Sequence, residues 1–486
     1  MQAKRTAAEA SLLSVSLDRE AKTPLHAQLA DQLRRLILNG RLPTGSKLAS
    51  SRKLSAELSV SRVTVVTAMD QLQSEGYIET RQGAGVFVTA DLPDGTVLRH
   101  GRGQGSGTDT PFVMPQAPEV RPFQTFLPDL SLFPHRQWAR TLDKVWRQPD
   151  AALLAHQDPF GWPALRVAIA EHLAAWRGIA CSPEQIVITA GTRDAIDLIA
   201  HSAFRTGDTV LVEDPGYKSL GLALADGGLT VRPVPVGPQG FDIARGTALA
   251  PEARGAVVTP SRQFPLGMTL PVARRLDLLA WARGADGLLI EDDYDSEFRY
   301  SGAPLPALMS LDEHGAVVYL GSFSKVLSPT FRLGFLVAPS RLVEPIRDRL
   351  RATGPRASFL VQPVLARFMA EGHFAAHVRR MRRVYGQRRD VLAEALAERL
   401  GDVLEIGDLS AGMHVVVRLR DDRAPAKTDT AIAARALEAG LVLQPLSSYY
   451  AGKPRSQGLV LGYAAFDEAV LIDGVRILSE ILGTHP

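Results

Sequence analysis

A stretch rich in glycine and proline divides this chain of 486 residues into two parts. Between residues 91 and 122, glycine alternates with polar residues from Gly101 to Gly107, and several prolines follow. Such a composition buries too little apolar surface to offset the conformational entropy lost on folding. We therefore expect a flexible linker at 91–122, stiffer near its prolines, between separately folding units at residues 1–90 and 123–486.

After the linker, apolar strand-like runs alternate with amphipathic helical segments. The runs lie at residues 186–190, 209–213, 256–259, 288–291 and 317–320. Alternation of this kind is typical of an α/β domain with a mostly parallel sheet. From about residue 340 the pattern becomes helix-rich and then mixed, which indicates a smaller α+β unit at the C-terminal end.

The composition excludes several classes of protein. A single cysteine, Cys181, permits no intramolecular disulfide and none of the usual cysteine-based zinc sites. No apolar run reaches the length of about 18 residues that a membrane span needs. The first residues also lack the apolar stretch of a secretory signal. We expect a cytoplasmic protein with no metal and no membrane partner.

The first unit has the pattern of a small DNA-binding domain. An amphipathic helix that ends at Asn39-Gly40 precedes a short helix and a third helix capped by Ser61, and two short strand-like runs follow. This is the layout of a winged helix-turn-helix, whose later helix enters the major groove. The segments in order are 24–38, 51–58, 62–75, 77–80 and 86–89.

The charge distribution is compatible with DNA binding. Residues 1–90 hold twelve Lys/Arg against eight Asp/Glu, whereas the remainder holds 43 against 44. An excess of this size is also common on ordinary solvated surfaces. Charge by itself therefore leaves open whether this unit binds nucleic acid or another protein.

Two segments of this unit resemble the GntR-type DNA-binding domain. They are L-A-S-S-R-K-L-S-A-E-L-S-V-S-R-V-T-V at 48–65 and E-G-Y-I-E-T-R-Q-G-A-G-V-F-V at 75–88, with Ala49 where a proline is usual. The resemblance implies a double-stranded DNA operator as partner. It places five residues at the DNA: Arg52, Ser61, Arg62, Thr64 and Gly83.

Four separated motifs carry the chemistry of the second unit. Ala190-Gly191-Thr192-Arg193 follows an apolar run and opens a helix, where free backbone N–H groups suit a phosphate. Asp214-Pro215-Gly216-Tyr217 places an aromatic side chain after another strand, where it can stack on a ring or belong to the core. Either motif taken alone is a weak signal.

The other two motifs contain ionisable groups. Ile290 to Asp295 reads I-E-D-D-Y-D; a carboxylate there can pair with a protonated pyridine nitrogen, although an acidic loop or metal site has the same pattern. Lys325 follows a strand and stands among Ser322, Ser324 and Arg332. A lysine that forms a Schiff base needs a lowered pKa, and the hydroxyl and guanidinium groups suit a phosphate.

In this order and spacing, the four motifs resemble the class I, fold-type I aminotransferase domain. With the GntR-type head in front of this domain, the chain resembles the MocR/GabR family of regulators. The sequences of that family are close to T-P-S-R-Q-F-P-L-G at 259–267 and E-D-D-Y-D-S-E-F-R-Y at 291–300. The resemblance implies pyridoxal 5′-phosphate (PLP) as cofactor, a homodimer, and Lys325 as the Schiff-base lysine. The implied cofactor-binding set is Thr192, Arg193, Tyr217, Asp292, Tyr294, Ser322, Lys325 and Arg332.

Three positions depart from the class I pattern. Phe264 replaces the asparagine before Pro265, which removes a contact to the ring hydroxyl, and His156 stands where a tyrosine normally reaches the partner's phosphate. The late strand, 458–463, lacks the arginine that grips a substrate carboxylate, and Arg455 nearby is a candidate for binding an acidic effector. These changes suggest a site that keeps PLP without being tuned for amino-acid turnover.

Three hypotheses follow from the sequence. The favoured one is a PLP-dependent transcriptional regulator that senses a small amine, an amino acid or PLP itself, with at most a residual transaminase half-reaction. The second is an active aminotransferase with an accessory DNA-binding head, which multiple turnover would reveal. The third is a PLP-free body that senses PLP levels or a partner, which the absorbance of the purified protein would reveal.

Overall fold

The computed structural model describes residues 15–21, 23–81, 84–90, 120–149, 151–155, 158–302, 306–420 and 428–483. The chain forms two compact units, residues 1–116 and 117–486. Most of the predicted linker at 91–122 lies outside the described residues, so its flexibility stays a prediction. In the parts of the chain that the structure describes, no helix is both long and apolar enough to cross a membrane.

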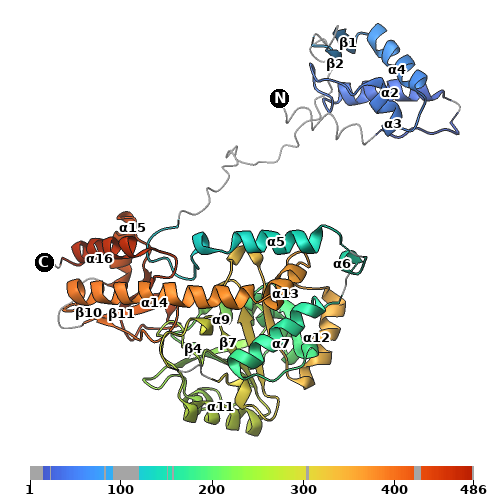
Figure 1. Ribbon diagram of the computed structural model, residues 1–486. Helices are drawn as coiled ribbons and strands as arrows, with labels where there is room; N and C mark the ends of the chain where they lie inside the picture. Colours follow the sequence, from blue (N-terminus) through green and yellow to red (C-terminus); the bar gives the residue numbers. More distant parts are fainter. Residues whose placement is uncertain are drawn as a thin grey trace. The chain divides into compact units, whose positions relative to one another are not determined.

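The described residues of the first unit pack three helices and a two-stranded wing around one core (Figure 1). The strands are antiparallel, with Ile78 opposite Val88, and both side chains are buried with Leu29, Leu33 and Leu54. The predicted winged helix-turn-helix is therefore confirmed. Its elements are α2 (Leu25–Leu38), α3 (Ser51–Glu57), α4 (Arg62–Ser74), β1 (Ile78–Arg81) and β2 (Gly85–Val88).

Hydroxyl caps define the turn between α3 and α4. The side chain of Ser50 accepts a hydrogen bond from the backbone N–H of Lys53, and that of Ser61 accepts one from Thr64 at 3.1 Å. Each cap satisfies an N–H group that the first helical turn leaves without a partner. The two serines thus set where each helix begins.

The second unit is built on a seven-stranded sheet with the order β3-β9-β8-β7-β6-β4-β5. Strands β4 to β8 are parallel, and β9 runs antiparallel to both of its neighbours. The prediction of a mostly parallel sheet is confirmed. The strands are β3 (Ile186–Thr189), β4 (Thr209–Asp214), β5 (Thr230–Pro235), β6 (Gly255–Val258), β7 (Leu288–Asp293), β8 (Val317–Ser322) and β9 (Gly334–Val337).

Helices cover both faces of this sheet. Along β7, Leu288 and Ile290 pack with α8 (Thr192–Ala203), α9 (Lys218–Asp226) and α12 (Ser340–Thr353), whereas Leu289 packs with α10 (Ile243–Leu249) and α11 (Val272–Ala285). Successive side chains of a strand point to opposite faces, so a strand buried on both faces must be apolar throughout. This is why these strands stand in the sequence as continuous apolar runs.

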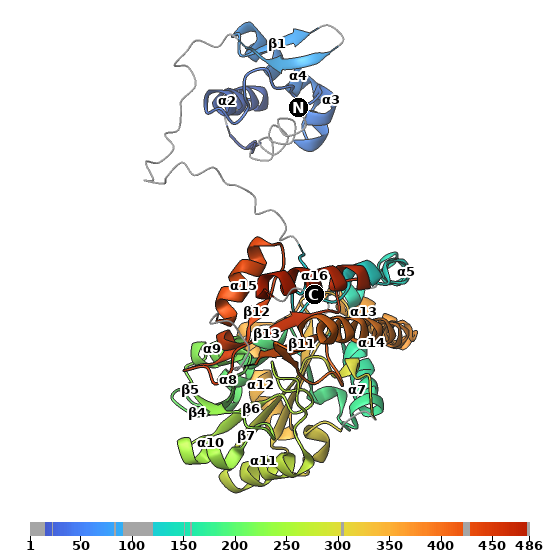
Figure 2. The ribbon, with the colours of Figure 1, turned by 90° about the vertical axis from the view of Figure 1, so that its left-hand side faces the viewer.

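The C-terminal part forms the predicted smaller α+β unit, an antiparallel sheet with the order β10-β11-β13-β12. Figure 2 shows the long helix α14 beside this sheet, together with α15 and α16. The bounds are β10 (Leu404–Ile406), β11 (His414–Leu419), β12 (Gln444–Pro445), β13 (Gly458–Gly462), α14 (His373–Leu400), α15 (Asp429–Glu438) and α16 (Glu468–Leu482); the remaining helices are α5 (His135–Trp146), α6 (Ala151–Ala155), α7 (Pro163–Arg177) and α13 (Gln362–Ala370).

Candidate cofactor site and DNA-binding helix

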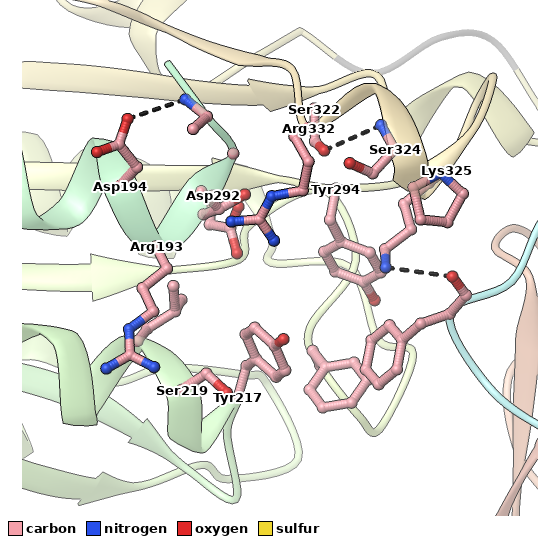
Figure 3. Close-up of a pocket in the computed structure, with 17 residues that line it drawn as sticks. Arg193, Asp194, Tyr217, Ser219, Asp292, Tyr294, Ser322, Ser324, Lys325 and Arg332 are labelled. Atoms are coloured by element: carbon pink, nitrogen blue, oxygen red, sulfur yellow. Dashed lines mark hydrogen bonds between the residues drawn. The ribbon is translucent and has the colours of Figure 1, made fainter. Parts of the chain in front are cut away.

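A cavity of about 350 Å³ lies at the carboxyl ends of the central strands (Figure 3). All eight residues predicted to bind the cofactor line it, although their motifs are spread from residue 192 to residue 332. The carboxyl ends of neighbouring parallel strands meet at one edge of a sheet, which is where α/β proteins bind ligands. The lining residues outside that set include Phe126, Asp194, Ser219, Phe264 and Ser324.

Lys325 follows β8 and extends its amine into the cavity (Figure 3). Its Nζ donates a hydrogen bond to the carbonyl of Phe126 at 3.3 Å and lies 4.6 Å from the centre of the Phe126 ring. Burial lowers the pKa of Lys325 to about 8, although the carboxylates of Asp292 and Asp295 oppose this change. An amine that loses its proton near pH 8 is a better nucleophile at neutral pH than a surface lysine.

The end of β7 supplies both a carboxyl and a phenol to the cavity. Burial, together with the nearby charges of Asp293 and Glu213, raises the pKa of Asp292 to about 7. Asp293 belongs to the opposite face of the strand, where it pairs with Arg177 at 2.8 Å. The buried hydroxyl of Tyr294 makes no hydrogen bond within the described part of the chain. The unpaired phenol of Tyr294 and the buried carboxyl of Asp292 thus both line the cavity.

The start of α8 and the residues around the end of β8 give the cavity groups that suit an anion. Helix α8 begins after Gly191, which has φ +116° and whose cap position provides no side-chain hydrogen bond to the first turn. Ser322, the last residue of β8, and Ser324 and Arg332, which follow that strand, also line the cavity. Backbone N–H groups at a helix start, hydroxyls and a guanidinium together match the oxygens of a phosphate.

Arg193 has a different position from the one that the motif suggested. Its side chain is 66% exposed and pairs with Asp226 on α9 at 2.7 Å. The residue still lines the cavity through its place in the first turn of α8. A phosphate contact from the guanidinium would have to compete with that ion pair, so the backbone is the better-placed part of Arg193.

Phe126 is a site residue that the sequence did not reveal. It lies between the linker and α5, has φ +67°, and its ring is 5.5 Å from Tyr217 and 5.1 Å from Phe264, measured between ring centres. The nearest sequence signal is the run R-P-F-Q-T-F-L-P at 121–128, which places two phenylalanines at the start of the body. No local pattern connects that run with Lys325.

Two further residues singled out from the sequence, Arg455 and His156, are not placed in the cavity. Arg455 is not among the lining residues; its guanidinium pairs with the Asp214 carboxylate at 2.8 Å and also donates to the Asp214 carbonyl. The contact joins the β12–β13 segment to the end of β4. His156 lies outside the described residues.

In the first unit, four of the five residues predicted at the DNA are described. Arg62 is exposed at the start of α4, and its Nε lies 3.4 Å from the hydroxyl of Ser51. The hydroxyls of Ser61 and Thr64 lie 2.8 Å apart, so both take part in the helix cap. Arg52 is exposed on α3, and Gly83 lies outside the described residues.

Comparison with known protein families assigns both units. Residues 25–88 match the model of the bacterial regulatory proteins of the gntR family, and residues 135–471 match that of aminotransferase class I and II. The chain is 37% identical over 471 residues to the probable rhizopine catabolism regulatory protein MocR of Rhizobium meliloti, covering 95% of this chain and 94% of that protein.

The chain belongs to the MocR-like family of transcriptional regulators. These regulators join a GntR helix-turn-helix to an aminotransferase-like domain. Similar members include the pyridoxine biosynthesis regulator PdxR of Corynebacterium glutamicum, at 35% identity over 94% of this chain and 96% of that one. TauR of Rhodobacter capsulatus is 32% identical over 92% of this chain and 94% of that protein.

Solved aminotransferases resemble the second unit of this regulator. The Pyrococcus horikoshii kynurenine aminotransferase, in complex with PMP, superposes with a TM-score of 0.67 at 26% identity, over 74% of this chain and 90% of that one. LysN of Thermus thermophilus, complexed with N-(5′-phosphopyridoxyl)-L-leucine, superposes with a TM-score of 0.66 at 28% identity, over 74% and 91%. The predicted aminotransferase fold is thus confirmed.

Proposed function

We propose that this regulator binds PLP at Lys325 and adjusts its DNA binding according to what occupies the cavity. The observation that carries the proposal is the convergence of Lys325, Asp292 and Tyr294 with the anion-binding end of α8 in one cavity. The signal is a small amine, an amino acid or PLP itself. The solved relatives with a pyridoxal-type group, and the pyridoxine biosynthesis role in the name of PdxR, agree with this choice.

The residues present fit PLP. The unpaired Tyr294 hydroxyl is placed for the phenolic oxygen of the ring, and a buried Asp292 carboxylate is suited to a protonated pyridine nitrogen. The start of α8 with Ser322 and Arg332 would hold the phosphate. When bound through its carbonyl to the Lys325 amine, PLP supplies an electrophilic carbon that other primary amines attack.

Phe126 gives a route from the cavity to the DNA-binding unit. The strap, residues 123–129, directly follows the linker at 91–122 and is anchored on both sides of Phe126. On one side the Phe123 carbonyl accepts from Gly462 at 2.8 Å; on the other, Asp129 pairs with Arg388 at 2.8 Å. A ligand that displaces the Phe126 ring from Lys325 therefore acts on the chain segment that leads to the head.

The walls of the cavity define what the effector can be. Among the residues that line it, the cationic side chains are Arg193, Lys325 and Arg332. The described residues that line the cavity do not include any from the late strand β13, whose Val460 is buried among Leu266, Val416 and Leu446. An effector therefore depends on its amine for covalent capture more than on a carboxylate, which agrees with amines and PLP as candidates.

The test uses the full chain with Lys325→Ala and the surface variant Lys144→Ala. Wild type and Lys144→Ala should bind PLP with a new absorbance band near the visible edge, and borohydride should fix the pyridoxyl group on Lys325. Lys325→Ala should lack both. A pyridoxyl group on any other residue would overturn the assignment.

The regulatory part is tested by DNA binding with and without ligand. Operator affinity should change on adding PLP alone, or on adding PLP with a primary amine, and the change should be lost in Lys325→Ala. PLP alone identifies PLP as the signal, whereas a requirement for the amine identifies an amine effector. Sustained turnover of an amine donor with a keto acid, without any effect on DNA binding, would favour an aminotransferase instead.

A further inference from the structure

Helix α4 exposes two valines that the core of the first unit does not use. The Val63 side chain is 73% exposed and that of Val66 is 37% exposed, whereas Val65, Ala68 and Leu72 of the same helix are buried in the core. Residues three apart lie on the same face of a helix. The two valines therefore form one apolar strip on the outer face of α4, which we call the valine strip.

The polar groups around this strip are partly occupied within the protein. The Ser61 and Thr64 hydroxyls cap the helix and lie 2.8 Å apart, and Arg62 reaches towards Ser51. In the first two turns, the remaining outward positions are those of Val63, Val66 and Thr67. The start of α4, the part of the helix that enters the major groove, thus presents the apolar side chains of Val63 and Val66 beside the hydroxyl of Thr67.

Charge indicates what covers this strip. Arg52 and Lys53 on α3 and Arg62 on α4 are all exposed near the start of the helix, which suits a phosphate backbone on either side of a groove. The unit belongs to the gntR family of regulators, so the occupant of this face is double-stranded DNA. Arginines next to an apolar strip combine backbone contacts with contacts to bases.

We propose that Val63 and Val66 read thymine in the operator by packing against its C5-methyl group. In the major groove, the methyl of thymine is the apolar group that distinguishes one base edge from the others. Valine makes no hydrogen bond that another base could satisfy, and its β-branched side chain is stiff in a helix. The proposal rests on the DNA-binding function and adds the base that these two residues select.

The spacing of the valines defines the expected pattern. Three residues of helix advance by about 4.5 Å, and stacked bases advance by about 3.4 Å. The two side chains therefore meet neighbouring base pairs, or base pairs one step further apart. Each half-site should contain two thymines in that arrangement.

The experiment removes single methyl groups from the DNA. An operator is selected from random double-stranded DNA with the full chain, and each thymine of a half-site is then replaced in turn by deoxyuridine, which lacks only the methyl. For wild type, affinity should fall about fourfold at each of two positions in the half-site, the loss expected for one buried methyl group. Replacing the same thymine–adenine pair by a 5-methylcytosine–guanine pair should retain more affinity than replacing it by a cytosine–guanine pair.

Variants assign each methyl to a side chain. Val63→Ala should lose the deoxyuridine effect at one position and Val66→Ala at the other, and alanine keeps the helix intact because its helix propensity is higher. The control, Val272→Ala, changes a valine that is 64% exposed on α11 and should keep the wild-type response. The proposal would be overturned if deoxyuridine lowered the affinity about equally in wild type and in both α4 variants. It would also be overturned if deoxyuridine lowered the affinity of none of these proteins. Failure to select any DNA would overturn the DNA-binding function itself.

Discussion

At the scale of single residues, burial sets the chemistry of the cavity. Lys325 and Asp292 are both removed from water, which lowers the pKa of the amine to about 8 and raises that of the carboxyl to about 7. Both changes favour the neutral forms, because desolvation penalises charge of either sign. Near neutral pH, a small change in the surroundings of either group can therefore change its charge.

The rate at which PLP attaches to the ligand-free protein should follow the deprotonated amine of Lys325. Because the pKa of Lys325 is about 8, the rate should rise with pH and level off above that value. A lysine of ordinary pKa would keep gaining about tenfold per pH unit to about pH 10. Stopped-flow absorbance measures this rate. The same measurement with Nα-acetyl-lysine, whose side-chain amine is free, corrects for the titration of PLP itself.

Asp292→Asn provides the internal check on this pH dependence. The negative charge of Asp292 raises the pKa of Lys325, so its removal should move the midpoint to lower pH. A midpoint that stays in place, or moves upward, would mean that the two groups do not interact as the structure indicates.

Tyr294→Phe should have opposite effects on stability and on cofactor binding. Its buried hydroxyl lacks a hydrogen-bond partner among the described residues, and such a group costs about 1–3 kcal/mol. The ligand-free variant should therefore be as stable as wild type or more stable in thermal unfolding, while its affinity for PLP should fall. A variant destabilised without PLP would indicate that the hydroxyl is satisfied in the ligand-free protein.

At the scale of elements, the strap depends on close approach to β13. A Cβ atom on Gly462 would lie 2.2 Å from the carbonyl oxygen of Gln124 and 2.9 Å from the Cα of Thr125. Atoms of the backbone cannot move aside as a side chain can. Glycine at 462 therefore allows the segment carrying Phe126 to cross the cavity.

Gly462→Ala should destabilise the second unit by about 1–3 kcal/mol, the usual cost of overpacking. The displaced strap should also leave Lys325 more accessible, so PLP should attach faster. Urea unfolding and absorbance measure the two effects. The matched control is Gly452→Ala, whose added Cβ meets nothing within 4 Å and which should behave as wild type in both assays.

At the scale of the whole molecule, the head should bind DNA largely through charge. Arg52→Ala and Arg62→Ala each remove an exposed cation from the DNA face. If the residue contacts a phosphate, affinity should fall on all sequences and the salt dependence should decrease by roughly one unit. If it contacts a base, the loss should be about 1–3 kcal/mol at one position.

Binding curves at several salt concentrations, on selected and scrambled DNA, separate these outcomes. Arg420→Ala, an exposed arginine of the second unit, serves as the control. Two head variants that bind the operator with wild-type affinity would show that the head docks in another way.

The complete regulator should be a homodimer. Oligomers of soluble proteins are most often two-fold symmetric, and paired heads read paired half-sites. Light scattering at micromolar concentration should give twice the chain mass of 52.5 kDa. A monomer under these conditions would contradict the prediction and would require the site to be complete within one chain.

Local pattern was sufficient for much of the fold. Core-facing periodicity and the Ser61 cap predicted the helices of the head, and five continuous apolar runs predicted β3, β4, β6, β7 and β8. The unpredicted β5 lies at the edge of the sheet, includes Pro233 and Pro235, and alternates between exposed and partly buried residues as far as the buried Val234. β5 therefore lacks the signal of a strand buried on both faces. The unpredicted β9 is a short buried apolar run like β3 and β6, and it was not singled out from the sequence.

The sequence by itself determined the two units, the fold class and the motifs that meet in the cavity. Each of these depends on interactions between residues that are close in the sequence. Hydrophobic periodicity and helix caps indicate such interactions. The tertiary structure alone decided that Phe126 lies against Lys325, 199 residues away, and that Arg193 pairs with Asp226 on the neighbouring helix. It also decided that Val63 and Val66 remain uncovered. Contacts between distant segments depend on how the whole chain buries its apolar surface, and no local pattern encodes that outcome.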